Sequence, residues 1–172
     1  MLMPNYNLSR ITVLVVDSNR HMRTLVTEIL KGFGASNVID CSEGADALAE
    51  LRANKVDLVI CDWGMEPMDG CTFTKAVRAD ESSNPYVPII MISGRTEAAS
   101  VMQARDSGIT EFLAKPMSAT ALYRRIASII EGPRPFVRAE GFVGPERRRR
   151  KVSTYEGPDR RTLTPACASA AT

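Results

Sequence analysis

The sequence has no apolar run close to the roughly 18 residues that a helix needs to cross a bilayer. Its first ten residues, MLMPNYNLSR, lack the basic stretch and apolar segment of a secretory signal. Its four cysteines show no CxxC spacing, and its single histidine, His21, cannot form a histidine cluster. These absences predict a cytoplasmic protein without membrane insertion, disulfides or a thiolate metal site.

The charge of the 172-residue chain is unevenly distributed along its length. Residues 1–131 carry 13 Lys and Arg against 16 Asp and Glu, whereas residues 132–172 carry 9 against 4. The net charge of +2 therefore conceals an acidic part followed by a basic one. The length suits one ordinary domain with a tail.

Short β-branched apolar runs alternate with helical patterns through the acidic part. The expected strands are ITVLVVD, SNVID, VDLVICD, VPIIMIS and TEFLAKP. Between and after them, apolar residues recur at intervals of three and four, which predicts helices over 22–30, 44–53, 71–79, 97–107 and 119–130. Continuous apolar strands alternating with helices predict an α/β fold, a doubly wound five-stranded parallel sheet covered on both faces.

Four polar residues follow expected strands of this sheet: Asp17, Asp62, Ser93 and Lys115. The carboxyl ends of parallel strands meet at one edge, where ligands of such folds bind. We therefore expect these side chains to lie together. Ser118 is the expected N-cap of the last helix.

A short polar motif occurs twice near the C-terminus. Residues 142–148 read FVGPERR and residues 155–161 read YEGPDRR, with an aromatic residue, Gly, Pro, an acid and two arginines in matching order. Glycine, proline and arginine interrupt every apolar period after residue 131. The arginine-rich extension at 132–165 is therefore predicted to be flexible when alone, with a disordered tail at 166–172.

The repeated arginines allow three interpretations. A solvated basic tail is the usual explanation of a charge run, and RRRRK at 147–151 would also suit the phosphates of nucleic acid. Nucleic acid is the weaker interpretation, because the acids Glu146 and Asp159 beside the arginines oppose phosphate binding. Arginine can instead donate to O6 and N7 of guanine while a carboxylate accepts from the opposite edge. Cyclic di-GMP, alone or as an intercalated dimer, has two guanines and two phosphates and would need such a set twice.

The stretches VLVVDSNRHMR, DLVICDWGMEPMDG, IIMISGRTEAA and EFLAKPMSATAL resemble the landmarks of a CheY-like response-regulator receiver domain over residues 10–131. The resemblance implies a flavodoxin-like fold with Asp62 as phosphoacceptor. It also implies Mg²⁺ held by Asp17, Asp62 and the Gly64 carbonyl. Lys115 would pair with the phosphoryl oxygens and Ser93 would hydrogen-bond to them. Phe112, three residues before the lysine, would couple the site to a surface.

The sequence departs from that family pattern at two positions. Ser18 follows Asp17 where the family usually has a second acid, and Glu66 stands where proline is usual. Fewer carboxylates weaken a site for a hard cation. A receiver that keeps Asp62 and Lys115 only as a buried ion pair is therefore the alternative.

A receiver followed by an arginine-rich extension resembles the Cle family, the CheY-like cyclic di-GMP effectors of bacteria. The resemblance implies a binding module rather than an enzyme, one that binds cyclic di-GMP through its extension and then engages the flagellar motor switch protein. It would thereby change motility and surface attachment, with recruitment to the flagellated pole. The expected ligand-binding residues are Arg147, Arg148, Arg149, Arg150, Tyr155, Asp159, Arg160 and Arg161. The alternative is a response regulator controlled by a histidine kinase through Asp62, whose basic tail docks on an acidic partner or nucleic acid.

Overall fold

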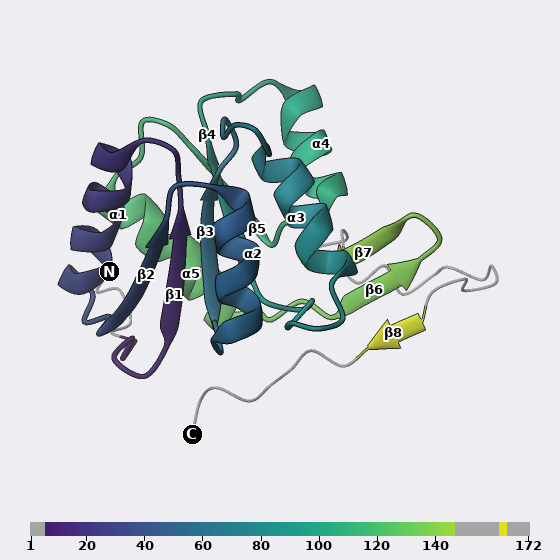
Figure 1. Cartoon of the computed structure of the whole chain (residues 1–172), viewed down its shortest axis with the longest axis horizontal. Coiled ribbons are helices and arrows are strands. Elements are labelled where there is room, and N and C mark those ends of the chain that lie inside the picture. Colours follow the sequence, from purple (N-terminus) through teal and green to yellow (C-terminus); the bar gives the residue numbers. More distant parts are fainter. Residues whose placement is uncertain (1–5, 147–161, 165–172) are drawn as a thin grey trace.

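A computed structural model describes residues 6–146 and 162–164 of the chain. Five parallel strands form the central sheet in the order β2-β1-β3-β4-β5 (Figure 1). This confirms the doubly wound sheet predicted from the sequence. The strands are β1 (Thr12–Val16), β2 (Asn37–Cys41), β3 (Leu58–Asp62), β4 (Ile89–Ser93) and β5 (Glu111–Ala114).

Five helices connect the strands and cover both faces of the sheet. They are α1 (Arg20–Gly32), α2 (Gly44–Ala53), α3 (Gly70–Ala79), α4 (Ala98–Ser107) and α5 (Ala119–Glu131). Side chains cap three of them: Asn19 accepts from the first turn of α1, Asp69 from α3 and Ser118 from α5. The predicted N-cap at Ser118 is thus confirmed. None of the helices in the described part of the chain has the length and apolar character needed to cross a membrane.

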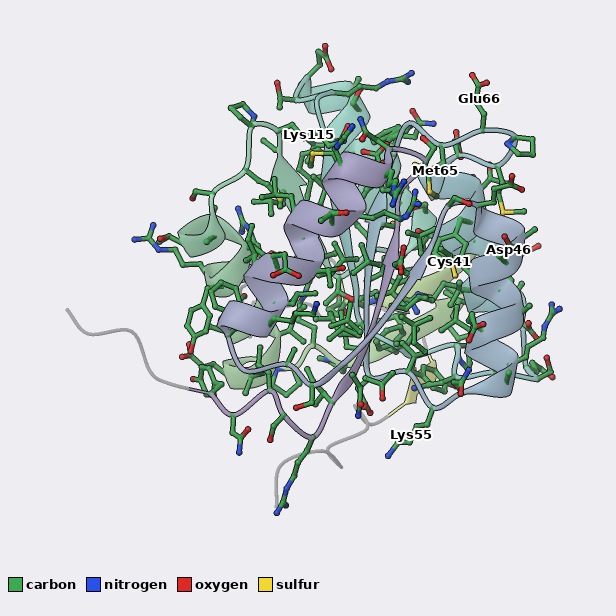
Figure 2. All side chains as sticks on the ribbon, turned by 60° about the vertical axis from the view of Figure 1, so that its left-hand side comes forward. Cys41, Asp46, Lys55, Met65, Glu66 and Lys115 are labelled. Atoms are coloured by element: carbon green, nitrogen blue, oxygen red, sulfur yellow. The ribbon has the colours of Figure 1, made fainter. Side chains whose placement is uncertain are left out.

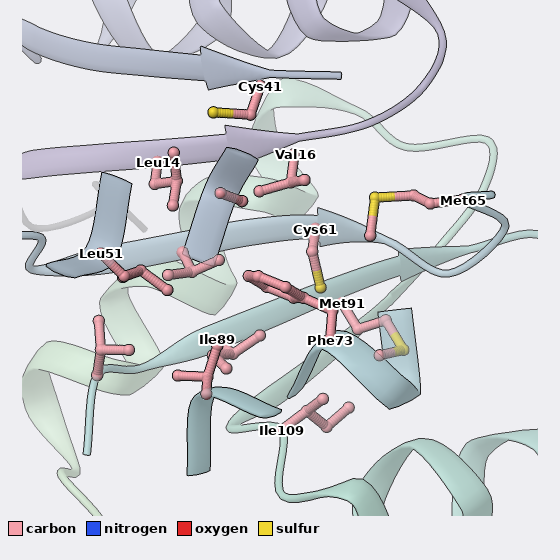
Figure 3. Packing of buried hydrophobic residues seen from close by; sticks show 14 of the residues in the cluster. Leu14, Val16, Cys41, Leu51, Cys61, Met65, Phe73, Ile89, Met91 and Ile109 are labelled. Carbon is pink, nitrogen blue, oxygen red and sulfur yellow. The ribbon is translucent and has the colours of Figure 1, made fainter. Parts of the chain in front are cut away.

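The alternation of strand side chains divides the core between the two faces of the sheet. On one face, Leu14, Cys61 and Met91 pack against Phe73 of α3, together with residues from α2 and α4 (Figure 3). On the other face, apolar residues of α1 and α5 pack against β1, β3 and β4. Every residue of β3 and β4 is buried, which explains their continuous apolar sequences.

The described beginning of the C-terminal extension is folded in the context of the whole chain. An antiparallel hairpin is formed by β6 (Phe136–Ala139) and β7 (Phe142–Pro145), and β8 (Thr162–Thr164) pairs with the other edge of β6. Gly141, at φ 76°, supplies the positive φ of the hairpin turn. The hairpin buries its apolar residues against the α/β domain rather than in a core of its own, and flexibility of the extension when alone stays a prediction.

The hairpin docks on the C-terminal ends of α3 and α4. Phe136 is 8% exposed, and its ring lies 5.0 Å from the guanidinium carbon of Arg78 in α3 and 5.3 Å from the ring of Tyr86. A Cβ atom on Gly144 would lie 2.8 Å from the Cα of Gly108, the residue that ends α4. Gly144 and Pro145 of the first motif copy both lie in β7.

Arg78 is buried beneath this hairpin without a carboxylate partner in the hydrogen bonds of the described residues. Its Nε donates to the carbonyl of Gly108, and its Nη1 donates to the carbonyls of Pro85 and Val87. Its Nη2 has no hydrogen-bond partner. Burial lowers the pKa of Arg78 to about 9, which still leaves it protonated at neutral pH. The cation is therefore stabilised by carbonyl oxygens and by the Phe136 ring.

The hairpin and the predicted site lie at opposite ends of the strands of the central sheet. Gly108 and the loop around Pro85 precede β5 and β4, whereas Lys115 follows β5. Figure 2 shows Lys115 at the same end of the molecule as Met65 and Glu66, and Lys55 at the opposite end. The carboxyl edge of the sheet is thus separate from the surface on which the hairpin docks.

Candidate functional site

The carboxyl edge of the sheet brings together three of the residues selected from the sequence. Nζ of Lys115 lies 2.7 Å from Oδ1 of Asp62 and 3.7 Å from Oδ2 of Asp17. The strand order explains this convergence, because β1 and β4 both flank β3 and β5 flanks β4. Asp17 and Asp62 are 6% and 8% exposed, so the lysine bridges two nearly buried carboxylates.

Two glycines that follow β3, Gly64 and Gly70, lie against Asp62. The backbone N–H of Gly64 donates to Oδ2 of Asp62 at 2.8 Å, and a Cβ on Gly64 would lie 3.3 Å from that oxygen. A Cβ on Gly70 would lie 2.4 Å from the carbonyl oxygen of Asp62. The chain can therefore pack this closely on the Asp62 backbone only with glycine at position 70, whereas a side chain at position 64 would require a shift of a few tenths of an ångström.

Burial and neighbouring charges perturb the carboxyl group of Asp17. Burial raises its pKa above the ordinary aspartate range, and the charge of Asp62 raises it further. The N–H of Asn19, which donates to Oδ1 of Asp17 at 2.7 Å, and the charge of Lys115 both act in the opposite direction. A further positive charge close to Asp17 would favour its ionised form.

Ser93 and Phe112 extend the site along β4 and β5. Ser93 is 2% exposed, and its Oγ accepts from the N–H of Arg95 at 2.9 Å. Its carbonyl accepts from the N–H of Lys115 at 2.8 Å, which fixes the lysine beside β4. Phe112 is half-buried against the core and is the register partner of Met91. The coupling of Phe112 to a partner surface stays a prediction.

Sequence reasoning missed the contact between Trp63 and Arg95. Trp63, directly after Asp62, is only 2% exposed, and the guanidinium carbon of Arg95 lies 5.5 Å from its ring centroid. An arginine two residues after Ser93 is the signal that could have pointed to this contact.

The donor set suits a hard divalent cation with few protein ligands. Asp17 and Asp62 supply carboxylate oxygens, and Gly64 could add a backbone carbonyl, which is the oxygen chemistry that Mg²⁺ prefers. Mg²⁺ usually keeps several waters and needs only one or two carboxylates. In the part of the chain that the structure describes, no group of three or more His, Cys, Asp or Glu residues could hold a metal. Mg²⁺ therefore fits the site, but with weaker charge compensation than a third acid would give.

The predicted dinucleotide-binding residues lie outside the described residues. This applies to Arg147, Arg148, Arg149, Arg150, Tyr155, Asp159, Arg160 and Arg161. What the structure does describe is the chain on either side of them. The first arginines follow β7 and Glu146, and the last two precede β8.

The fold and the acidic edge with its lysine define a CheY-like α/β domain. The family model of the response regulator receiver domain matches residues 13–127, and the chain belongs to this family. Chemotaxis protein CheY of Pseudomonas aeruginosa is 29% identical over 119 residues, which are 69% of this chain and 95% of that protein. Chemotaxis protein CheY-3 of Vibrio cholerae is 30% identical over the same share of this chain and 91% of its own length.

Solved structures show the same similarity in three dimensions. CheY4 of Vibrio cholerae superposes with a TM-score of 0.65 at 28% identity, over 69% of this chain and 98% of its own. The receiver domain of the histidine kinase CKI1 from Arabidopsis thaliana, complexed with Mg²⁺ and BeF₃⁻, gives a TM-score of 0.61 at 28% identity, over 70% and 92%. These matches cover about as much of the chain as the family model does, which ends before β6.

Proposed function

We propose that this response regulator is a cyclic di-GMP effector whose arginine-rich extension binds the dinucleotide and whose receiver domain then engages the flagellar motor switch. The observation that carries the proposal is the repeated motif, with Phe142–Pro145 of the first copy in β7 and Arg161 of the second directly before β8. Both strands pair with β6. The two arginine pairs are thus attached to opposite edges of one small sheet.

The pairing register brings the ends of the ligand-binding segment close together. Pro145 and Thr164 both lie opposite Phe136, and Thr162 lies opposite Arg138. From ordinary strand spacing and rise, Pro145 and Thr162 are roughly 12 Å apart. Anchoring both ends lowers the entropy that a ligand must remove to order a segment, which supports binding of one compact ligand by both arginine pairs.

A second set of contacts holds the start of this segment against the receiver domain. The N–H of Glu146 donates to the carbonyl of Pro135 at 2.8 Å, and Nη1 of Arg134 donates to the carbonyl of Glu146 at 3.4 Å. Nη2 of Arg134 also lies 3.6 Å from the carboxylate of Glu111, which is buried in β5. The end of β7 is therefore tied to the sheet of the receiver, which offers a route from a bound ligand to the domain.

Isothermal titration of the full chain with cyclic di-GMP tests the proposal. An Arg160→Ala, Arg161→Ala variant should bind at least about tenfold more weakly, because each charge-assisted hydrogen bond contributes about 1.5 to 3 kcal/mol. The matched control replaces two exposed arginines of the α/β domain, Arg10 and Arg124, by alanine in the same way and should retain binding. The wild type should not exchange cyclic di-GMP for duplex DNA. Absence of binding to the wild type would refute the second-messenger function.

A specific observation favours a second candidate function, phosphoryl acceptance at Asp62. Lys115 at 2.7 Å from Asp62 supplies the positive charge that a carboxylate attacking a phosphoryl group needs. The CKI1 receiver, which is similar in fold, is complexed with Mg²⁺ and the phosphoryl mimic BeF₃⁻. A histidine kinase would be the natural phosphoryl donor.

Two variants separate these functions in cells. If cyclic di-GMP is the controlling input, the Arg160→Ala, Arg161→Ala variant should lose the effect on swimming and attachment while Asp62→Asn retains it. The reverse pattern would make phosphorylation the controlling input. Purified motor switch protein should retain the wild-type chain more strongly when cyclic di-GMP is present, measured by co-sedimentation.

A further inference from the structure

A cation lies beside the acceptor site on the loop between β4 and α4. The guanidinium of Arg95 rests over Trp63, the neighbour of Asp62, with 5.5 Å between its central carbon and the ring centroid. The backbone N–H of the same residue donates to Oγ of Ser93. Arg95 therefore contacts a residue next to the acceptor and one that the family uses in phosphoryl binding, although no role was assigned to it from the sequence.

Charge balance gives this arginine a role. The site holds two carboxylates, Asp17 and Asp62, against the ammonium group of Lys115. The nearby guanidinium of Arg23 donates to the Asp17 carbonyl and is already paired with Asp40. A phosphoryl group on Asp62 would replace one negative charge by nearly two at neutral pH. With Ser18 in place of a second acid after β1, a divalent cation would be bound less firmly. A phosphorylated site would thus need an additional cation from the protein.

The surroundings of Arg95 allow its guanidinium to supply this additional positive charge. Its side chain is exposed, and a Cβ on the preceding Gly94 would have nothing within 4 Å. Stacking of an exposed guanidinium on an aromatic ring is a weak interaction, whereas arginine and a phosphoryl group can form two parallel charge-assisted hydrogen bonds. The position over Trp63 is therefore one that the arginine can leave when an anion is present.

We propose that Arg95 binds the oxygens of a phosphoryl group on Asp62, leaving the face of Trp63 to do so. The inference rests on phosphoryl acceptance by Asp62. In transfer from acetyl phosphate, a carboxylate oxygen of Asp62 forms the bond to phosphorus while the bond from phosphorus to the acetate oxygen breaks. Acetate leaves with that electron pair. Arg95 forms no covalent bond and stabilises the charge on the transferred group.

Tryptophan fluorescence tests the movement, because Trp63 is the single tryptophan of the chain. The full-length wild type and the variants Arg95→Ala and Arg95→Lys are titrated with beryllofluoride at fixed Mg²⁺, with Mg²⁺ alone as a second titration. The matched control is Arg105→Ala, an exposed arginine of α4 that pairs with Asp106. Isothermal titration measures the same affinities without relying on the indole signal.

Loss of the arginine should weaken beryllofluoride binding about tenfold, as expected for one lost charge-assisted contact, with partial recovery in the lysine variant. Mg²⁺ affinity should not fall, because removing a cation cannot weaken the binding of another cation electrostatically. Equal beryllofluoride affinity in wild type and Arg95→Ala would overturn the proposal, and so would a parallel loss of Mg²⁺ affinity. If the wild type bound no beryllofluoride and gained no phosphoryl mass with acetyl phosphate, phosphoryl acceptance itself would fail.

Discussion

Replacing Phe136 by alanine should release the hairpin from the receiver domain while the domain stays folded. The ring is buried on Arg78 and Tyr86, so its removal forfeits about 2 kcal/mol of apolar burial. It also forfeits about 1 kcal/mol of cation–π attraction. Hydration of the unpaired Nη2 of Arg78 returns about 1 kcal/mol. The net loss is about 2 kcal/mol of docking free energy, which corresponds to roughly thirtyfold more opening.

Hydrogen exchange measured by mass spectrometry can test the expected increase in hairpin opening segment by segment. Amides of 136–145 should exchange roughly thirtyfold faster in Phe136→Ala, whereas amides of β3 should keep their protection. Ile130→Ala removes a partly exposed apolar side chain from α5 and should leave the hairpin unchanged. Unchanged exchange in the hairpin would refute the docking argument, and equal acceleration in β3 would show that hairpin and domain unfold as one unit.

Three substitutions around the carboxyl edge have definite expected effects in urea unfolding. Asp17→Asn should raise the unfolding midpoint at pH 7, and this gain should shrink as the pH falls toward 4. The reason is that the pKa of Asp17 is raised in the folded state. The wild type therefore has a stability contribution that is present at low pH and lost as the pH rises through that pKa. Lys115→Met should lose roughly 2 kcal/mol at pH 7, because two nearly buried carboxylates lose their cation, and Asp62→Asn in the same chain should restore part of it. Gly70→Ala should cost roughly 1 to 3 kcal/mol through the clash with a backbone carbonyl, unlike Gly32→Ala, whose Cβ meets no atom. Each argument would be contradicted by equal unfolding midpoints: of wild type and Asp17→Asn, of Lys115→Met and the double variant, or of Gly70→Ala and Gly32→Ala.

The central sheet could be predicted because its signals are local. ITVLVVD and VPIIMIS are apolar throughout since both faces of these strands are covered. The rule that parallel strands present their carboxyl ends at one edge then placed Asp17, Asp62 and Lys115 together, and the structure has them within 4 Å of the shared lysine nitrogen. The chemical roles assigned to these residues stay predictions.

The hairpin could not be predicted because its stability comes from tertiary contacts. Phe136 and Val137 stand in a stretch rich in glycine, proline and arginine, without the periodicity that indicates a strand. Their docking depends on a buried arginine in α3 and on the fit between Gly108 and Gly144, which lie far apart in the sequence. The same holds for Arg95, because its contact with Trp63 crosses between the ends of two different strands.

The docking surface of the hairpin should allow the extension to be transferred to other receiver domains. Its requirements on the receiver are few: an arginine at the end of α3, a glycine in left-handed conformation after α4, an aromatic residue at position 86 and a buried glutamate in β5 that pairs with Arg134. None of these residues belongs to the acidic edge. Transplanting residues 132–172 onto another receiver that carries Arg, Gly, Tyr and Glu at the equivalent positions should therefore create a chimera that keeps its host's own acceptor chemistry. The sequence between β7 and β8 could then vary without disturbing the domain that carries it.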